Sequence, residues 1–200
     1  MPSAPAAYQL KISLVDSEPE IWRQVIVPQS ITLAQLHLVI QLAMGWENIH
    51  PYAFDVGLGE LRSRCTNTQP LADTLSAEAL AKEEPLYYTY DFESGWLHRI
   101  TIEAIKAEAL DNSTPDKDSA TDQALLTCTD GAGACPPEGT GGVWGYDDFL
   151  DRLEDSNDPD YLTLIEKYGT FDPDVFDAKA AAARLEAHSI PTSHRGALRR

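Results

Sequence analysis

The chain has 200 residues, 43% of them hydrophobic, which suits one domain with its own core and argues against disorder throughout. Its formal net charge of −17 argues against direct nucleic acid binding, because such binding needs a basic surface. No apolar run reaches the about 18 residues of a membrane span, and the N-terminus lacks the basic and apolar parts of a secretion signal. We therefore expect a cytoplasmic protein that does not contact membranes.

The first half of the chain begins with two predicted strands. Apolar residues alternate with polar ones over residues 8–14, and β-branched residues dominate residues 21–27. A helix is expected over residues 30–46, because apolar residues recur there at every third or fourth position. Thr32 and Gln35 form a capping box at its start, and Gly45 suits its C-terminal cap.

The middle of the chain contains the clearest hairpin. Strands are predicted over residues 86–92 and 96–105, joined by Glu93, Ser94 and Gly95, where the glycine permits a tight turn. Before this hairpin, weaker patterns predict strands over residues 52–56 and 58–65 and a short helix over residues 76–82.

The second half of the chain is predicted to be more helical. Residues 108–123 are polar and predict a flexible insertion, and residues 125–129 predict one more strand. Residues 131–145 are rich in Gly and Pro and predict a loop. Helices are expected over residues 147–155, over residues 160–168 and within residues 171–190, the last with Asp177 near its start.

Strands and helices occur in blocks, which favours an α+β fold. We expect a largely antiparallel sheet packed by one long helix in the N-terminal half and by a C-terminal helical layer. Residues 1–190 would form a single domain, and residues 191–200 a basic tail. The predicted core comprises Leu10, Ile12, Trp22, Leu36, Val39, Ile40, Phe54, Tyr90, Phe92, Ile100, Ile102, Trp144, Phe149 and Leu153.

Several unusual strings occur in a fixed order along the chain. They are IWRQV at residues 21–25 with AMGW at 43–46, NIHPYAF at 48–54, YDFESGWLH at 90–98, ACPPEGTGGVWGY at 134–146 and FDP at 171–173. In this order they resemble the Ri-plasmid ORF-three-like protein family, which also includes passenger proteins of bacterial insertion elements. The resemblance covers roughly residues 8–177. It implies a compact α+β domain of uncharacterised biochemical function, associated with plasmids or mobile elements.

Aromatic and histidine side chains from separate segments could line one concave wall that binds a small molecule or a partner protein. The candidate contacts are Trp46, His50, Tyr52, Asp91, Trp96, His98 and Trp144. The leading hypothesis is therefore a non-catalytic binding module. The competing interpretation is that the tryptophans are core anchors.

A metal site is the second hypothesis, because imidazole and thiolate groups are zinc ligands. His98, Cys128 and Cys135 are its candidate ligands, and with Asp91 they would serve a metal-dependent hydrolase. Cys128 and Cys135 are seven positions apart, unlike the cysteines of a zinc knuckle, and buried structural roles explain them better. No cofactor other than zinc is indicated. A third hypothesis is that the acidic surface mimics DNA and inhibits a DNA-binding protein.

Overall fold

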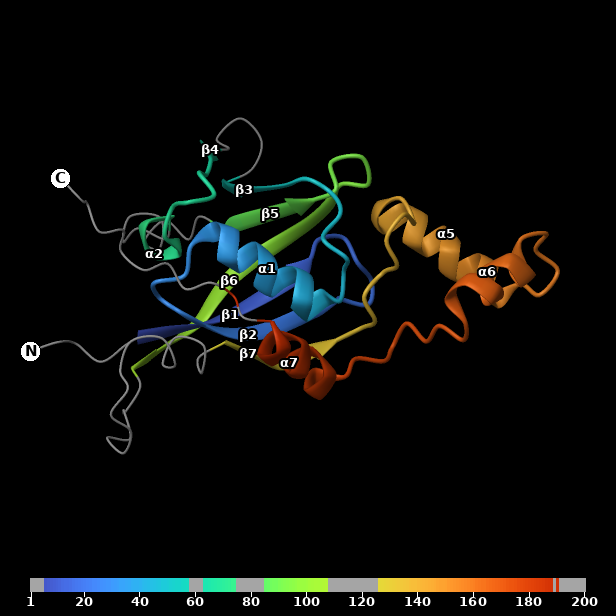
Figure 1. Ribbon diagram of the computed structural model, residues 1–200. Helices are drawn as coiled ribbons and strands as arrows, with labels where there is room; N and C mark the ends of the chain where they lie inside the picture. The colour runs from blue at the N-terminus through green and yellow to red at the C-terminus, as the bar shows by residue number, and fades with distance from the viewer. Residues whose placement is uncertain (1–5, 58–62, 75–84, 108–125, 189, 191–200) are drawn as a thin grey trace, which may run out of the picture.

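The computed structural model describes residues 6–57, 63–74, 85–107, 126–188 and 190 (Figure 1). Within these ranges the chain forms a seven-stranded sheet in the order β4-β3-β5-β6-β1-β2-β7, and all the paired strands are antiparallel. The strands are β1 (Ala6–Leu14), β2 (Trp22–Pro28), β3 (Tyr52–Val56), β4 (Ser63–Arg64), β5 (Leu86–Tyr90), β6 (Trp96–Ala107) and β7 (Thr127–Ala132). The predicted α+β class with a largely antiparallel sheet is confirmed.

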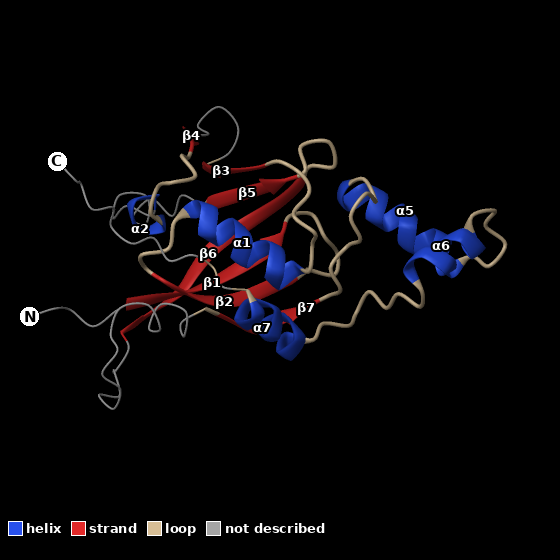
Figure 2. Ribbon diagram, in the orientation of Figure 1, coloured by secondary structure: helices blue, strands red, loops and turns tan. Residues whose placement is uncertain are grey.

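The helices of the described residues are α1 (Leu33–Met44), α2 (Leu71–Thr74), α5 (Gly142–Glu154), α6 (Tyr161–Tyr168) and α7 (Ala178–Ala187). Helices α1 and α7 lie over one face of the sheet, whereas α5 and α6 extend beyond its end (Figure 2). The expected C-terminal helical layer is therefore divided, and only α7 packs on the sheet. None of the helices in the described ranges has the length and apolarity needed to cross a bilayer.

Helix α1 has the caps that the sequence predicts. The Thr32 side chain accepts a hydrogen bond from the backbone of Gln35, the Gln35 side chain returns one, and Gly45 adopts the left-handed conformation with a φ of 102°. The helix is shorter than the predicted range of residues 30–46, because it begins at Leu33 and ends at Met44. It has 12 residues, and α5 has 13.

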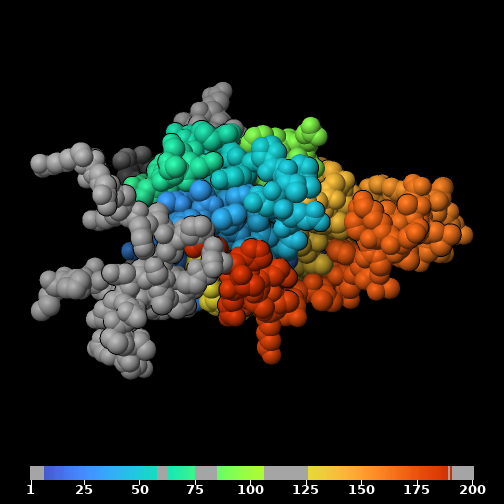
Figure 3. All heavy atoms as spheres, in the orientation of Figure 1, coloured from blue at the N-terminus to red at the C-terminus, as the bar shows by residue number. Residues whose placement is uncertain are grey.

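The core lies between the sheet and α1. Strand alternation directs Leu10 and Ile12 of β1 toward this helix, and both are fully buried together with Leu36 and Ile40 of α1. The segment that contains α5 and α6 projects from the end of this body in the space-filling view (Figure 3). Tyr146 and Phe149 anchor it to the core.

Three residues of the predicted core lie elsewhere. Trp22 is only partly buried, because it follows the alternation of β2 onto the opposite face of the sheet. Phe92 is 53% exposed, because β5 ends at Tyr90 and Phe92 falls in the turn. Trp144 is 82% exposed, because α5 begins inside the predicted loop and directs this side chain to solvent.

Several predicted segments fall outside the described residues. They are the helix over residues 76–82, the insertion over residues 108–123, the tail over residues 191–200 and most of the strand over residues 58–65, of which β4 is described.

Candidate functional site

Three loops meet at the end of the sheet that faces α5 (Figure 1). They are residues 45–51 between α1 and β3, residues 91–95 between β5 and β6, and residues 133–141 before α5. We call them the loop junction. The Trp46 indole N–H donates to the Pro136 carbonyl at 2.9 Å, and the Asp91 backbone N–H donates to the Pro51 carbonyl at 2.9 Å. Hydrogen bonds therefore join all three loops.

The Glu138 carboxylate holds the centre of the loop junction. Its Oε1 accepts hydrogen bonds from the Glu47 backbone N–H at 2.9 Å and from the Tyr90 hydroxyl at 2.8 Å. The Tyr90 hydroxyl in turn accepts from the backbone N–H groups of Ile49 and His50. Burial and the bond to Glu138 raise the pKa of Tyr90 to about 12, so this hydroxyl keeps its proton. No sequence pattern marked Glu138 as a site residue, although it lies in one of the unusual strings.

Asp91 organises the turn between β5 and β6. Its carboxylate accepts hydrogen bonds from the Ser94 hydroxyl at 2.5 Å and from the Glu93 backbone N–H at 3.2 Å. Burial alone would raise the pKa of Asp91, but these hydrogen bonds hold it below its usual value. The half-buried imidazole of His50 lies 3.8 Å from the same carboxylate. Because Ser94 donates to Asp91 rather than to His50, the turn contains no Ser–His nucleophile pair.

The predicted aromatic wall is not formed, because most of its members belong to the core. Trp46, Trp96 and His98 are buried, and the Trp46 ring lies 5.8 Å from the Trp96 ring and 5.3 Å from the His98 ring. Tyr52 is partly buried and stacks on His37 with 3.5 Å between the ring centroids. Trp46 and Trp96 therefore pack in the core, whereas Trp144 is exposed and His50 is partly exposed.

His98 is fully buried and is hydrogen-bonded to the backbone. Its Nδ1–H donates to the carbonyls of Trp96 at 3.1 Å and Tyr88 at 3.3 Å. Burial lowers its pKa to about 4, so the imidazole is neutral at physiological pH.

Cys128 and Cys135 lie near a buried positive charge. Burial raises the pKa of both thiols, that of Cys135 to about 12, so both keep their protons. The buried guanidinium of Arg23 is close enough to His98, Cys128 and Cys135 to act electrostatically on each of them. A zinc ion held by these three would be repelled by that guanidinium. Among the described residues, moreover, no three His, Cys, Asp or Glu side chains are grouped to hold a metal.

A buried polar network beside the loop junction was not foreseen. Gln41 donates to the Tyr88 hydroxyl at 2.8 Å, Tyr88 to His37 Nδ1 at 2.7 Å, and His37 Nε2 to the Asn48 side chain at 2.8 Å. Asn48 has a φ of 58°, and this bond helps to hold it there. The available signal was the presence of Gln41 and His37 among the apolar residues of α1.

Comparison with known proteins identifies the family of the chain. Residues 6–180 match the family described as plasmid pRiA4b ORF-3-like protein. The chain belongs to this family. It is 37% identical over 180 residues to the uncharacterized protein y4hQ of Sinorhizobium fredii, which covers 86% of this chain and 84% of that protein. The crystal structure of MM3350 from Methanosarcina mazei Go1, a protein of unknown function, has a TM-score of 0.70 and 29% identity, covering 88% of this chain and 98% of that one.

The predicted family resemblance is thus confirmed, and neither relative's name states an activity. In this ORF-3-like chain, four of the strings that carry the resemblance contribute to the loop junction. They are residues 43–46, 48–54, 90–98 and 134–146, which the fold brings together in space.

Exposed apolar side chains accompany the loop junction. Ile49 is 65% exposed and Phe92 is 53% exposed, and each belongs to one of its loops. Trp144 follows on the first turn of α5, whose Gly142 is packed against the Ser94 carbonyl. This end of the molecule therefore combines a hydrogen-bonded interior with apolar groups that face solvent.

Proposed function

We propose that this ORF-3-like chain is a non-catalytic recognition module that binds a segment of a partner protein at the loop junction. The observation that carries the proposal is Trp144, whose side chain is 82% exposed. Burying a tryptophan against a partner removes a large apolar surface from water, and Trp is enriched among the residues that dominate binding energies. Ile49 and Phe92 would extend the contact.

The backbone around Trp144 supports this role. A methyl group on Gly142 would come within 2.2 Å of the Ser94 carbonyl, and one on Gly145 within 1.8 Å of the Thr140 carbonyl. The backbone of α5 is therefore closely packed at Gly142 and Gly145, the glycines that precede and follow Trp144 in the sequence. A side chain presented from a fixed backbone loses less conformational entropy on binding, which favours affinity.

The alternative functions have less support. The metal-dependent hydrolase would need ligands beside the Arg23 guanidinium, where a second cation is disfavoured. The DNA-mimic hypothesis also expects a protein partner, but it makes the net charge decisive rather than Trp144. Exchange of Trp144 therefore separates it from the present proposal.

The test compares Trp144→Ala with Leu162→Ala, which removes another large exposed side chain, 78% exposed, from α6. Each immobilised variant and the wild type are incubated with an extract of cells that encode the protein, and captured proteins are quantified by mass spectrometry. We expect a partner that wild type and Leu162→Ala retain and Trp144→Ala loses by tenfold or more. Circular dichroism confirms that the variants are folded. If capture of every protein is the same with Trp144→Ala, the proposal is wrong.

A further inference from the structure

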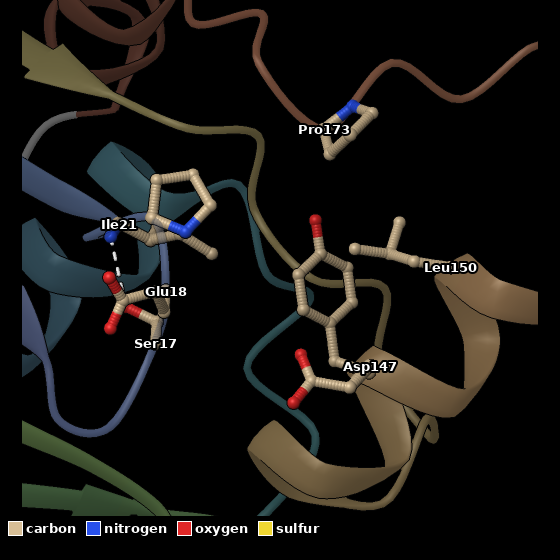
Figure 4. A pocket seen from close by; sticks show the side chains of 8 residues that line it. Ser17, Glu18, Ile21, Asp147, Leu150 and Pro173 are labelled. Atoms are coloured by element: carbon tan, nitrogen blue, oxygen red, sulfur yellow. Dashed lines mark hydrogen bonds between the residues drawn. The ribbon is translucent and has the colours of Figure 1, made fainter.

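A small pocket lies between the β1–β2 turn and α5 (Figure 4). Its walls include the apolar side chains of Ile21 and Leu150, and its lining also includes the exposed residues Glu18 and Asp147. The enclosed space accommodates about one water-sized group. The pocket is therefore too small for a drug-sized ligand, but it has the size of a single charged group.

Tyr146 gives this pocket an unsatisfied polar group. The residue lines the pocket, is 4% exposed, and its hydroxyl has no hydrogen-bond partner among the described residues. A buried hydroxyl without a partner costs free energy. Burial raises the pKa of Tyr146 to about 12, so the oxygen stays a neutral acceptor at physiological pH. A donor that entered the pocket would therefore find an acceptor inside it.

The charges around the pocket favour a cation. Glu18 and Asp147 carry carboxylates, and neither Lys nor Arg is among the residues that line it. The three segments of the loop junction also contain no Lys or Arg in their sequences. With a net charge of −17 on the chain, the field at this end of the molecule attracts positive groups and repels anions.

We infer that the pocket receives the ammonium group of a lysine side chain from the partner segment that binds at the loop junction. The inference rests on the proposed function and names the chemistry of the partner. Trp144 and Asp147 are three positions apart in α5, so their side chains are neighbours on the helix surface. A segment that covers Trp144 thus reaches the mouth of the pocket.

Lysine fits this pocket better than arginine does. Its ammonium group is compact and close to water in size, whereas a guanidinium is a wide planar fork. The aliphatic stem of lysine would contact Ile21 and Leu150, while the ammonium group donates to Tyr146 and pairs with Glu18 and Asp147.

Nuclear magnetic resonance tests this inference without the partner. The methyl resonances of Ile21 and Leu150 are followed during titration with n-butylammonium chloride, which mimics the lysine side chain. Uncharged 1-butanol and n-propylguanidinium, an arginine mimic, are titrated in parallel. We expect saturable shifts with n-butylammonium, at least fivefold weaker binding of n-propylguanidinium, and no saturation with 1-butanol.

Matched variants locate the effect. Glu18→Gln with Asp147→Asn removes the two pocket charges and should weaken n-butylammonium binding at least tenfold. Glu166→Gln with Glu186→Gln removes two exposed charges on α6 and α7 and should change the affinity less than twofold. Absent shifts, an equal response to 1-butanol, or equal weakening in both double variants would overturn the inference.

The partner experiment separates the two proposals. If a partner shows Trp144-dependent capture but binds the Glu18→Gln, Asp147→Asn variant as tightly as wild type, the lysine inference fails and the proposed function stands. If n-butylammonium binds as expected but no protein shows Trp144-dependent capture, the proposed function fails, and with it the assignment of the ammonium group to a partner.

Discussion

Replacing Gly142 by alanine tests the contact between α5 and the β5–β6 turn. Gly142 has a φ of +79°, and a Cβ atom there would lie 2.2 Å from the Ser94 carbonyl oxygen. The left-handed backbone costs a residue with a Cβ atom about 1–2 kcal/mol. Relieving the clash with a backbone atom costs about 1–3 kcal/mol more, by analogy with overpacked cores. We therefore expect Gly142→Ala to lower the free energy of unfolding by about 2–5 kcal/mol.

Gly139→Ala is the matched control. Gly139 has a φ of +81°, and a Cβ atom there would meet nothing within 4 Å. The control therefore carries the conformational cost without the clash. Urea unfolding followed by circular dichroism gives both free energies, and the difference between the variants should be about 1–3 kcal/mol. If the two variants are equally stable, the close packing of α5 on the turn is refuted, and with it the fixed backbone that supports the role of Trp144.

Two further outcomes are expected. His37 and His98 have pKa values lowered to about 4 by burial, so the unfolded chain gains protons below pH 6.5 while the folded chain does not. The contribution of these histidines to the free energy of unfolding is fully present above pH 6.5 and should fall by about 2 kcal/mol per histidine by pH 5. Urea unfolding at several pH values measures this loss. A free energy of unfolding that is unchanged between pH 7 and pH 5 would contradict this. Arg23→Met should cost about 2–4 kcal/mol, because it removes the donor to the Ala132 carbonyl and one of the two arginine donors to the Ala43 carbonyl, the other being Arg184. Arg99→Met at an exposed position should change stability little. Similar unfolding curves for the two arginine variants would contradict the structural role of Arg23.

The elements that could be predicted are those set by local patterns. Strand β1 follows from alternation over a few residues, and α1 follows from apolar spacing with a capping box at Thr32 and a glycine at position 45. The start of α5 has no such signal. It begins at Gly142 after Gly141, with no side-chain cap, and both glycines have positive φ. The sequence pattern at this point indicates a loop, whereas in the structure Gly142 at the helix start packs closely against Ser94 of the turn.

The candidate site depended on contacts between distant residues, which local patterns do not contain. Glu138 meets Tyr90 and Glu47 across 48 and 91 positions of sequence. Likewise, Cys128 and Arg23 lie on the neighbouring strands β7 and β2, whose pairing includes a register shift between Gln24 and Val25. The chain pattern made thiols and an imidazole look like metal ligands, because nothing local showed that a guanidinium lies close to all three.

The hydrogen bonds of the loop junction favour recognition over catalysis. The Tyr90 hydroxyl already bonds to Glu138 and to two backbone N–H groups, and the Asp91 carboxylate is occupied by Ser94 and Glu93. Groups that hold loops in place are poorly suited to exchanging protons with a substrate, since each exchange would break a structural bond. Among the exposed side chains, those of Trp144, Ile49 and Phe92 are apolar and suit contact with the proposed partner. If the proposed partner binds there, the fixed polar groups beneath the exposed apolar side chains would already hold the surface in place, which would limit the entropic cost of binding.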